Sequence, residues 1–138
     1  MAKRRRGARS AGARSRPSRH RPFESLVELA IAAIPAPFAS ALDEVAIVIA
    51  DEPTPDQRRE NEIEDDDTLY GLYEGVPRTE WGADWAAVPN RITLFRLPLE
   101  ADFADPDELA DEVWETVIHE LAHHLGIDDR RLEELGID

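Results

Sequence analysis

Cysteine is absent from this 138-residue sequence, and methionine occurs only at Met1. Without a thiol, the chain can form no disulfide bond, thiolate zinc site or iron–sulfur cluster, and it has no thiol nucleophile. Long hydrophobic runs are absent too, since no stretch approaches the ~18 uninterrupted apolar residues of a membrane-spanning helix. A bound metal would therefore need nitrogen and oxygen ligands, and we expect no membrane span.

The sequence also lacks a clean apolar segment of the kind that a secretion signal requires. A basic start is followed by the apolar stretch 23–42, but this stretch carries Glu24 and Glu28, and Pro35 and Pro37 interrupt it. A signal peptide needs an uninterrupted apolar region at that point. Together with the absence of cysteine, this favours a cytoplasmic protein.

Acidic residues are missing from one part of the chain and abundant in the rest. Residues 1–23 contain nine basic residues and no acid, whereas 30 acidic residues and seven arginines follow them, a balance of −23. The basic segment has no apolar periodicity, so we predict a disordered tail over residues 1–22 and one folded domain over residues 23–138. We expect the tail to be a solvated extension over the acidic body. Weak contact with a polyanion (RNA, DNA or anionic lipid) is the alternative.

Hydrophobic patterns predict a mixture of helices and strands in the folded domain. The expected elements are a helix over about 23–34, a helical turn over 37–42, strands over 45–50, 69–73 and 91–97, a long helix between Asp105 and Gly126, and a short helix over about 129–135. Residues 45–50 are apolar at every position, which predicts a central strand covered on both faces. Residues 51–67 are almost wholly polar and predict a surface loop, and Gly71 marks a bulge or a close backbone approach.

The long helix has the clearest boundaries. Asp105 is a typical N-cap, Pro106 suits the first helical position, and Gly126 suits a left-handed C-cap. Apolar residues recur along one side from Ala110 to Leu125 and predict the face that packs on the core. The whole pattern predicts an α+β domain, in which a short mixed sheet packs on the N-terminal helix and on this long central helix.

This helix contains the segment His119-Glu120-Leu121-Ala122-His123. Residues i and i+4 share one helical face, so the two imidazoles can converge on one metal ion. Zinc accepts imidazole and carboxylate ligands and lowers the pKa of its bound water to about 7. Glu120 is then placed to accept a proton from that water and to pass it to a leaving amine. The segment predicts a zinc site with Glu120 as the catalytic base.

A catalytic zinc ion needs a third protein ligand, and Asp129 is the leading candidate. It lies six residues after His123, and Gly126 lets the backbone reverse between them. His124 is rotated by ~100° from His123 on a regular helix and is poorly placed for the same ion. Asp128 is a rival for the third position. A purely structural zinc site is a further alternative, although three protein ligands leave an open position, which favours catalysis.

Residues 119–129 resemble the extended zinc-binding motif of metzincin proteases, in the variant with Asp in place of the third His, as in snapalysin-like enzymes. The chain as a whole more closely resembles the small bacterial minimal zincin family of zinc metallopeptidases, and the similarity covers about residues 22–136. The segments that carry it are 23–30, 45–53, 69–77, 91–99 and 117–136. The resemblance implies a small zincin-like fold, Zn²⁺ as cofactor, Glu120 as general base, and the zinc ligands His119, His123 and Asp129.

The sequence departs from the metzincin pattern in two respects. Metzincins place a methionine-containing turn beneath the metal, and Met1 is the only methionine here. Nine residues follow Asp129, too few for the usual second subdomain. Two hypotheses therefore stand: a zinc-dependent metallopeptidase whose peptide or protein substrate pairs with a strand edge, or a non-catalytic zinc-binding or peptide-binding regulatory module.

Four aromatic residues are secondary candidates. Tyr70 and Tyr73 could bind substrate or stabilise an oxyanion, and Trp81 and Trp85 could rim a cleft. Packing in the core or against the sheet explains each of them at least as well.

Overall fold

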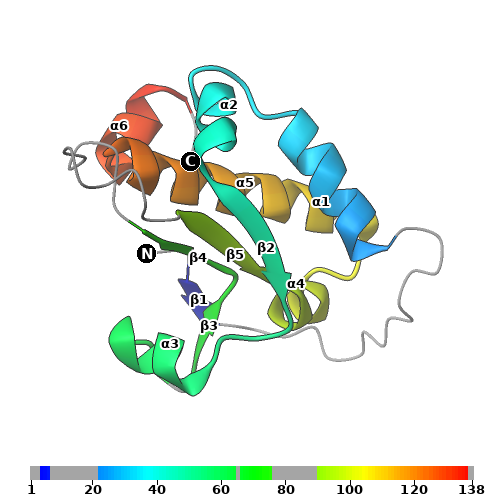
Figure 1. The fold of residues 1–138 in the computed structure, drawn as a ribbon. Helices are drawn as coiled ribbons and strands as arrows, with labels where there is room; N and C mark the ends of the chain where they lie inside the picture. The colour runs from blue at the N-terminus through cyan, green and yellow to red at the C-terminus, as the bar shows by residue number, and fades with distance from the viewer. Residues whose placement is uncertain (1–3, 7–21, 65, 76–89, 137–138) are drawn as a thin grey trace.

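The computed structural model describes residues 4–6, 22–64, 66–75 and 90–136 of the chain. The elements, in order, are β1 (Arg4–Arg6), α1 (Phe23–Ala32), α2 (Phe38–Ala41), the 3-10 helix η1 (Leu42–Glu44), β2 (Ala46–Ala50), α3 (Pro55–Glu60), β3 (Asp67–Leu69), β4 (Gly71–Glu74), β5 (Arg91–Phe95), α4 (Arg96–Asp102), α5 (Pro106–Leu125) and α6 (Asp129–Glu134). The long helix α5 lies across one face of a short sheet, and α1 packs against α5 (Figure 1). The domain is α+β, as predicted.

The sheet has three strands in the order β2-β5-β4, with β2 parallel and β4 antiparallel to β5. The central strand is therefore β5. The prediction that residues 45–50 form the central strand is wrong, because β2 lies at an edge of this sheet and its Val48 is 39% exposed. Ile47 and Ile49 pack against the core, so only one face of β2 is covered. An all-apolar run of five or six residues does not by itself distinguish an edge strand from a central one.

The structure confirms the boundaries of α5 that the sequence predicts. Asp105 caps its first turn, since its Oδ2 accepts hydrogen bonds from the N–H groups of Asp107 and Glu108, both at 3.1 Å. Gly126 ends the helix in the left-handed conformation with φ of 76°. The buried apolar side chains of α5 join those of α1 and β5 in the main core. The two caps set where α5 begins and ends, and its buried face holds it against α1 and β5.

The predicted strand over residues 69–73 is divided at Tyr70. β3 ends before it and pairs with β1, and β4 begins after it and pairs with β5. At Gly71 the backbone approaches α5 so closely that an added Cβ would lie 2.6 Å from Thr116 Cγ2. This confirms the close approach predicted at Gly71, and it brings β4 against the middle of α5.

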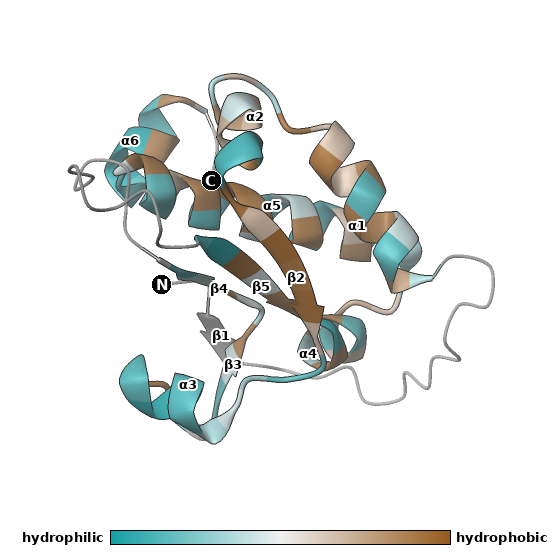
Figure 2. Ribbon diagram, in the orientation of Figure 1, coloured by the Kyte–Doolittle hydropathy of each residue, from teal (hydrophilic) through white to brown (hydrophobic). Residues whose placement is uncertain are grey.

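Two further segments differ from the prediction. The polar stretch 51–67 contains the helix α3, which begins with a capping box between Thr54 and Gln57. Figure 2 shows that α3 is mostly hydrophilic, in contrast to β2. It therefore has no apolar face by which a helix could have been recognised. The third predicted strand ends two residues early, at Phe95, and α4 follows directly.

The basic segment is described only in part. Arg4–Arg6 form β1, antiparallel to β3, whereas residues 1–3 and 7–21 lie outside the described residues, as do Trp81 and Trp85. The prediction of a disordered tail over residues 1–22 therefore stays a prediction. Among the helices that the structure describes, none combines the length and the apolar character that a membrane crossing requires.

Candidate functional site

The last two turns of α5 carry two polar pairs on adjacent sides of the helix. His119 and His123 form one pair, and both are partly exposed. Glu120 and His124 form the other, and both are 0% exposed. Each pair has the i, i+4 spacing that places its members one above the other. We refer to them as the outer pair and the buried pair.

Glu120 belongs to the buried pair and lies against β4. Its Oε1 accepts a hydrogen bond of 2.8 Å from the backbone N–H of Tyr73 and lies 3.4 Å from His123 Nδ1. Its Oε2 is buried and has no hydrogen-bond partner among the described residues. A buried carboxylate oxygen without a partner costs roughly 1–3 kcal/mol, so such an atom points to a ligand or water that would complete it.

The His119 ring keeps one nitrogen atom for a further ligand. His119 Nδ1 lies 2.9 Å from the backbone carbonyl oxygen of Glu115, which can only accept, so the ring nitrogen donates there. This contact fixes the tautomer and leaves Nε2 as the nitrogen with a lone pair. A histidine that ligates a metal commonly donates its other ring N–H in this way.

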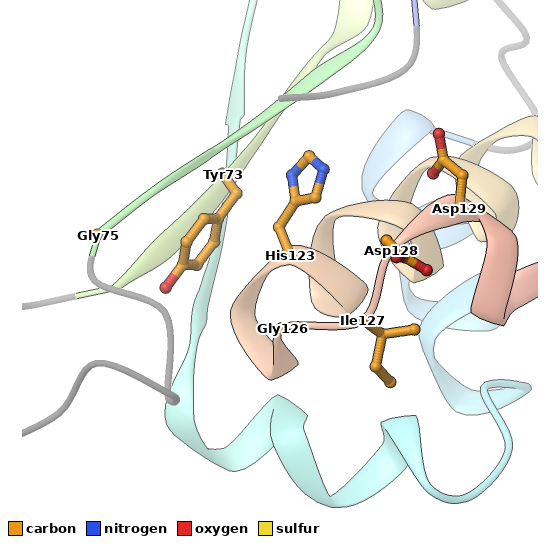
Figure 3. Close-up of a pocket in the computed structure, with 7 residues that line it drawn as sticks. All are labelled: Tyr73, Gly75, His123, Gly126, Ile127, Asp128 and Asp129. Carbon is orange, nitrogen blue, oxygen red and sulfur yellow. The ribbon is translucent and has the colours of Figure 1, made fainter.

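His123 and Asp129 line one pocket of about 490 Å³, at the end of α5 and the start of α6. The other lining residues are Tyr73, Gly75, Gly126, Ile127 and Asp128. Figure 3 shows the His123 imidazole and the Asp129 carboxylate on the same side of the turn between the two helices, with Ile127 pointing the opposite way. The left-handed turn at Gly126 thus brings two of the predicted ligands to one cavity.

The two aspartates in this turn have different surroundings. Asp128 is the N-cap of α6, and its Oδ1 accepts a hydrogen bond of 2.9 Å from the N–H of Arg131. Asp129 is the first residue of α6 and is exposed. Since capping already uses the Asp128 carboxylate, Asp129 is the better placed of the two to bind a ligand in the pocket.

The described residues do not bring the complete ligand set together. Among them, no group of three or more His, Asp or Glu side chains is close enough to hold a metal ion. The set His119, His123 and Asp129 therefore stays a prediction. Its donor atoms suit zinc, which accepts imidazole nitrogen and carboxylate oxygen. The unpaired Oε2 of Glu120 and the fixed tautomer of His119 fit a zinc site beside them.

The two tyrosines have different roles. Tyr70 is 1% exposed, and its hydroxyl donates a hydrogen bond of 2.6 Å to Asp102 Oδ2, so its place is in the core. Tyr73 lines the pocket with its ring, whereas its hydroxyl is turned away from the His123 imidazole (Figure 3). That hydroxyl lies 3.0 Å from both Asn90 Oδ1 and His124 Nδ1.

Sequence reasoning missed three groups around the site. Glu44 lies 80 residues from its partner His124, and Asn90 follows a proline in a segment without pattern, so neither gave a signal. The backbone N–H of Tyr73 could not be predicted from side-chain types, because almost every residue carries such a group. His124 was recognised as unsuited to the metal, and its complete burial agrees with that.

A family model of zincin-like metallopeptidases matches residues 42–137, which include β2 to β5, α5 and α6. The match covers more than two thirds of the chain, and the chain belongs to this family. The resemblance found in the sequence is thereby confirmed at the level of the zincin family. No curated protein matches the chain significantly.

Proposed function

We propose that this member of the zincin-like metallopeptidase family hydrolyses peptide bonds with Glu120 as general base and with a zinc ion held by His119, His123 and Asp129. The observation that carries the proposal is the state of Glu120. One carboxylate oxygen is held by the N–H of Tyr73, and the other is buried without a hydrogen-bond partner among the described residues. Because the hydrogen bond to Oε1 fixes the orientation of the carboxylate, Oε2 is the oxygen that can accept a proton.

The ligand residues and the base have separate tasks. A zinc ion bound by the two imidazoles and the Asp129 carboxylate would supply a Lewis acid that polarises a carbonyl group and acidifies water. The backbone carbonyl of Glu115 orients the His119 ring for that purpose. Gly126 and the cap at Asp128 set where the Asp129 carboxylate stands relative to His123.

Glu120 moves the proton. Its Oε2 accepts a proton from the attacking water and returns it to the nitrogen that leaves when the peptide C–N bond breaks. The hydrogen bond from Tyr73 N–H to Oε1 holds the carboxylate in one orientation during both transfers. Burial of the side chain keeps bulk water away from this oxygen.

The substrate is a peptide or protein segment in an extended conformation. β4 lies at an edge of the three-stranded sheet, and Tyr73 and Gly75, two residues further along, line the same pocket as His123. An extended peptide can pair with such an edge and pass over the site. We propose that the bond to be broken lies in this pocket, which His123 and Asp129 line.

One observation favours a second function. The three predicted ligands are not assembled among the described residues, which is compatible with a module that binds a peptide or zinc without turnover. The same experiment distinguishes the two functions.

The test compares zinc content and peptide cleavage in the wild type, Glu120→Gln and His119→Ala. The control is Asp111→Asn, an exposed carboxylate change on the same helix. Zinc is measured by mass spectrometry after dialysis, and cleavage with a mixture of fluorogenic peptides. We expect Glu120→Gln to keep zinc and lose roughly 10²–10⁴-fold in turnover, and His119→Ala to lose both. Wild-type protein that holds zinc and cleaves nothing would leave the binding module as the function.

A further inference from the structure

A chain of polar contacts runs from the protein surface to Glu120. His124 Nε2 donates a hydrogen bond of 2.8 Å to Glu44 Oε1, and His124 Nδ1 lies 3.0 Å from the hydroxyl oxygen of Tyr73. The backbone N–H of Tyr73 then donates to Glu120 Oε1 at 2.8 Å. The Glu44 side chain is 31% exposed, whereas His124 and Glu120 are 0% exposed. Buried polar groups that are joined in this way restrict one another's positions.

Tyr73 joins β4 to α5 through two polar contacts. Its main chain contacts Glu120, and its phenol contacts His124, one helical turn further along the same side of α5. The rings of Tyr73 and His124 also lie against each other, with centroids 5.7 Å apart and planes tilted by 56°. The buried pair therefore attaches one residue of the strand at two points.

β4 is a short edge strand, and the contacts of Tyr73 with α5 help to hold it in place. β4 has four residues and lies at an edge of the sheet, where it pairs with β5 on one side. After Glu74 the chain turns at Gly75, whose φ is 147° and where an added Cβ would lie 2.0 Å from Asn90 Oδ1. The same Asn90 oxygen accepts the Tyr73 hydroxyl. The phenol is thus held between α5 and the residue before β5.

Glu44 orients His124, which stands in the middle of this series of contacts. A carboxylate that accepts from one ring nitrogen of a histidine determines the direction of the other. Here Glu44, the last residue of η1, sets the His124 ring so that Nδ1 faces Tyr73. None of these three residues is a predicted zinc ligand.

We propose that Glu44, His124 and Tyr73 are positioning residues, which hold the Tyr73 backbone N–H where it orients the carboxylate of Glu120. The effect on turnover rests on the proposed function. The effect on the Tyr73 N–H does not, because it concerns a hydrogen bond of the protein alone.

The test measures hydrogen exchange of the amide of residue 73 by NMR in the full-length protein. Tyr73→Phe removes the hydroxyl and keeps the ring, and Glu44→Gln keeps the shape of a partly exposed partner. We expect Tyr73→Phe to accelerate exchange at residue 73 roughly tenfold, and Glu44→Gln to do so by a smaller factor. The reference is the Phe95 amide, which donates to Tyr70 O at 2.9 Å in the sheet and should not change.

Glu120→Ala removes the acceptor itself and should accelerate exchange at residue 73 at least as much as Tyr73→Phe. Unchanged exchange at residue 73 in Tyr73→Phe would overturn the proposal. Equal acceleration at residues 73 and 95 would overturn it as well, because it would indicate general loosening rather than loss of one contact. His124→Gln is a further variant, and the two substitutions above carry the test if it does not fold.

A second arm uses cleavage of the fluorogenic peptides. Tyr73→Phe and Glu44→Gln should lower kcat with zinc content unchanged, since neither residue is a predicted metal ligand. Glu44 does not line the pocket, so Glu44→Gln should also leave KM unchanged. A changed zinc content with normal kcat would overturn the positioning role. If the wild type cleaves no peptide, the proposed function fails, and the exchange measurement still decides whether this chain of contacts holds the amide of Tyr73.

Discussion

The outer and buried pairs of α5 differ in how far the polypeptide completes them. The buried pair, Glu120 and His124, has partners from β4 and η1, and one oxygen of Glu120 remains open. In the outer pair, His119 and His123, only His123 lines the pocket that Asp129 also lines, and the described residues assemble no group of three ligands. The two pairs, which lie within six consecutive residues of α5, therefore differ in their surroundings. The protein orients the proposed base, Glu120, by itself, whereas the predicted ligands His119, His123 and Asp129 are not assembled among the described residues.

The largest expected effect separates the two pairs directly. His123→Ala should reduce bound zinc more than tenfold, because two side chains cannot hold a catalytic zinc ion. His124→Gln should retain zinc, because its ring contacts Glu44 and Tyr73 and not the pocket. Zinc per protein after dialysis checks both. Equal zinc loss in the two variants would mean that the division between the pairs is wrong.

A second comparison concerns the two aspartates of the turn. Asp129→Ala should weaken zinc binding at least tenfold with little change in the midpoint of thermal unfolding of the zinc-free protein. Asp128→Ala should lower the stability of that protein by about 1 kcal/mol, the usual cost of losing an N-cap, and leave zinc affinity within a few-fold. Zinc titrations and denaturant unfolding measure the two effects. The opposite assignment of effects would make Asp128 the ligand.

A third comparison tests the contact between β4 and α5. Gly71→Ala places a methyl group 2.6 Å from Thr116 Cγ2 and should cost about 1–3 kcal/mol of folding stability. Because Tyr73 follows two residues later on the same strand, the substitution should also reduce turnover more than zinc content. Urea unfolding and zinc analysis check this. Normal stability would show that β4 lies further from α5 than the structure places it.

The sequence predicted α5 and its caps because the signals are local. Asp105, Pro106 and Gly126 act within one turn of where they stand, and the spacing of His119 and His123 follows from helix geometry alone. The prediction that residues 45–50 form a central strand was wrong, because the burial of a strand's faces depends on which strands and helices lie beside it. The contacts of Glu120 and His124 join residues 47 to 80 positions apart, which no local pattern encodes.

The most direct test of the central claim is a crystal structure of the zinc-loaded protein at a resolution that defines the coordination. We expect one zinc ion with Nε2 of His119, Nε2 of His123 and a carboxylate oxygen of Asp129 at about 2.0–2.2 Å, and with Glu120 unbound and still held by the Tyr73 N–H. An ion that is coordinated by Glu120 itself, or one that leaves Asp129 in solvent, would contradict the account.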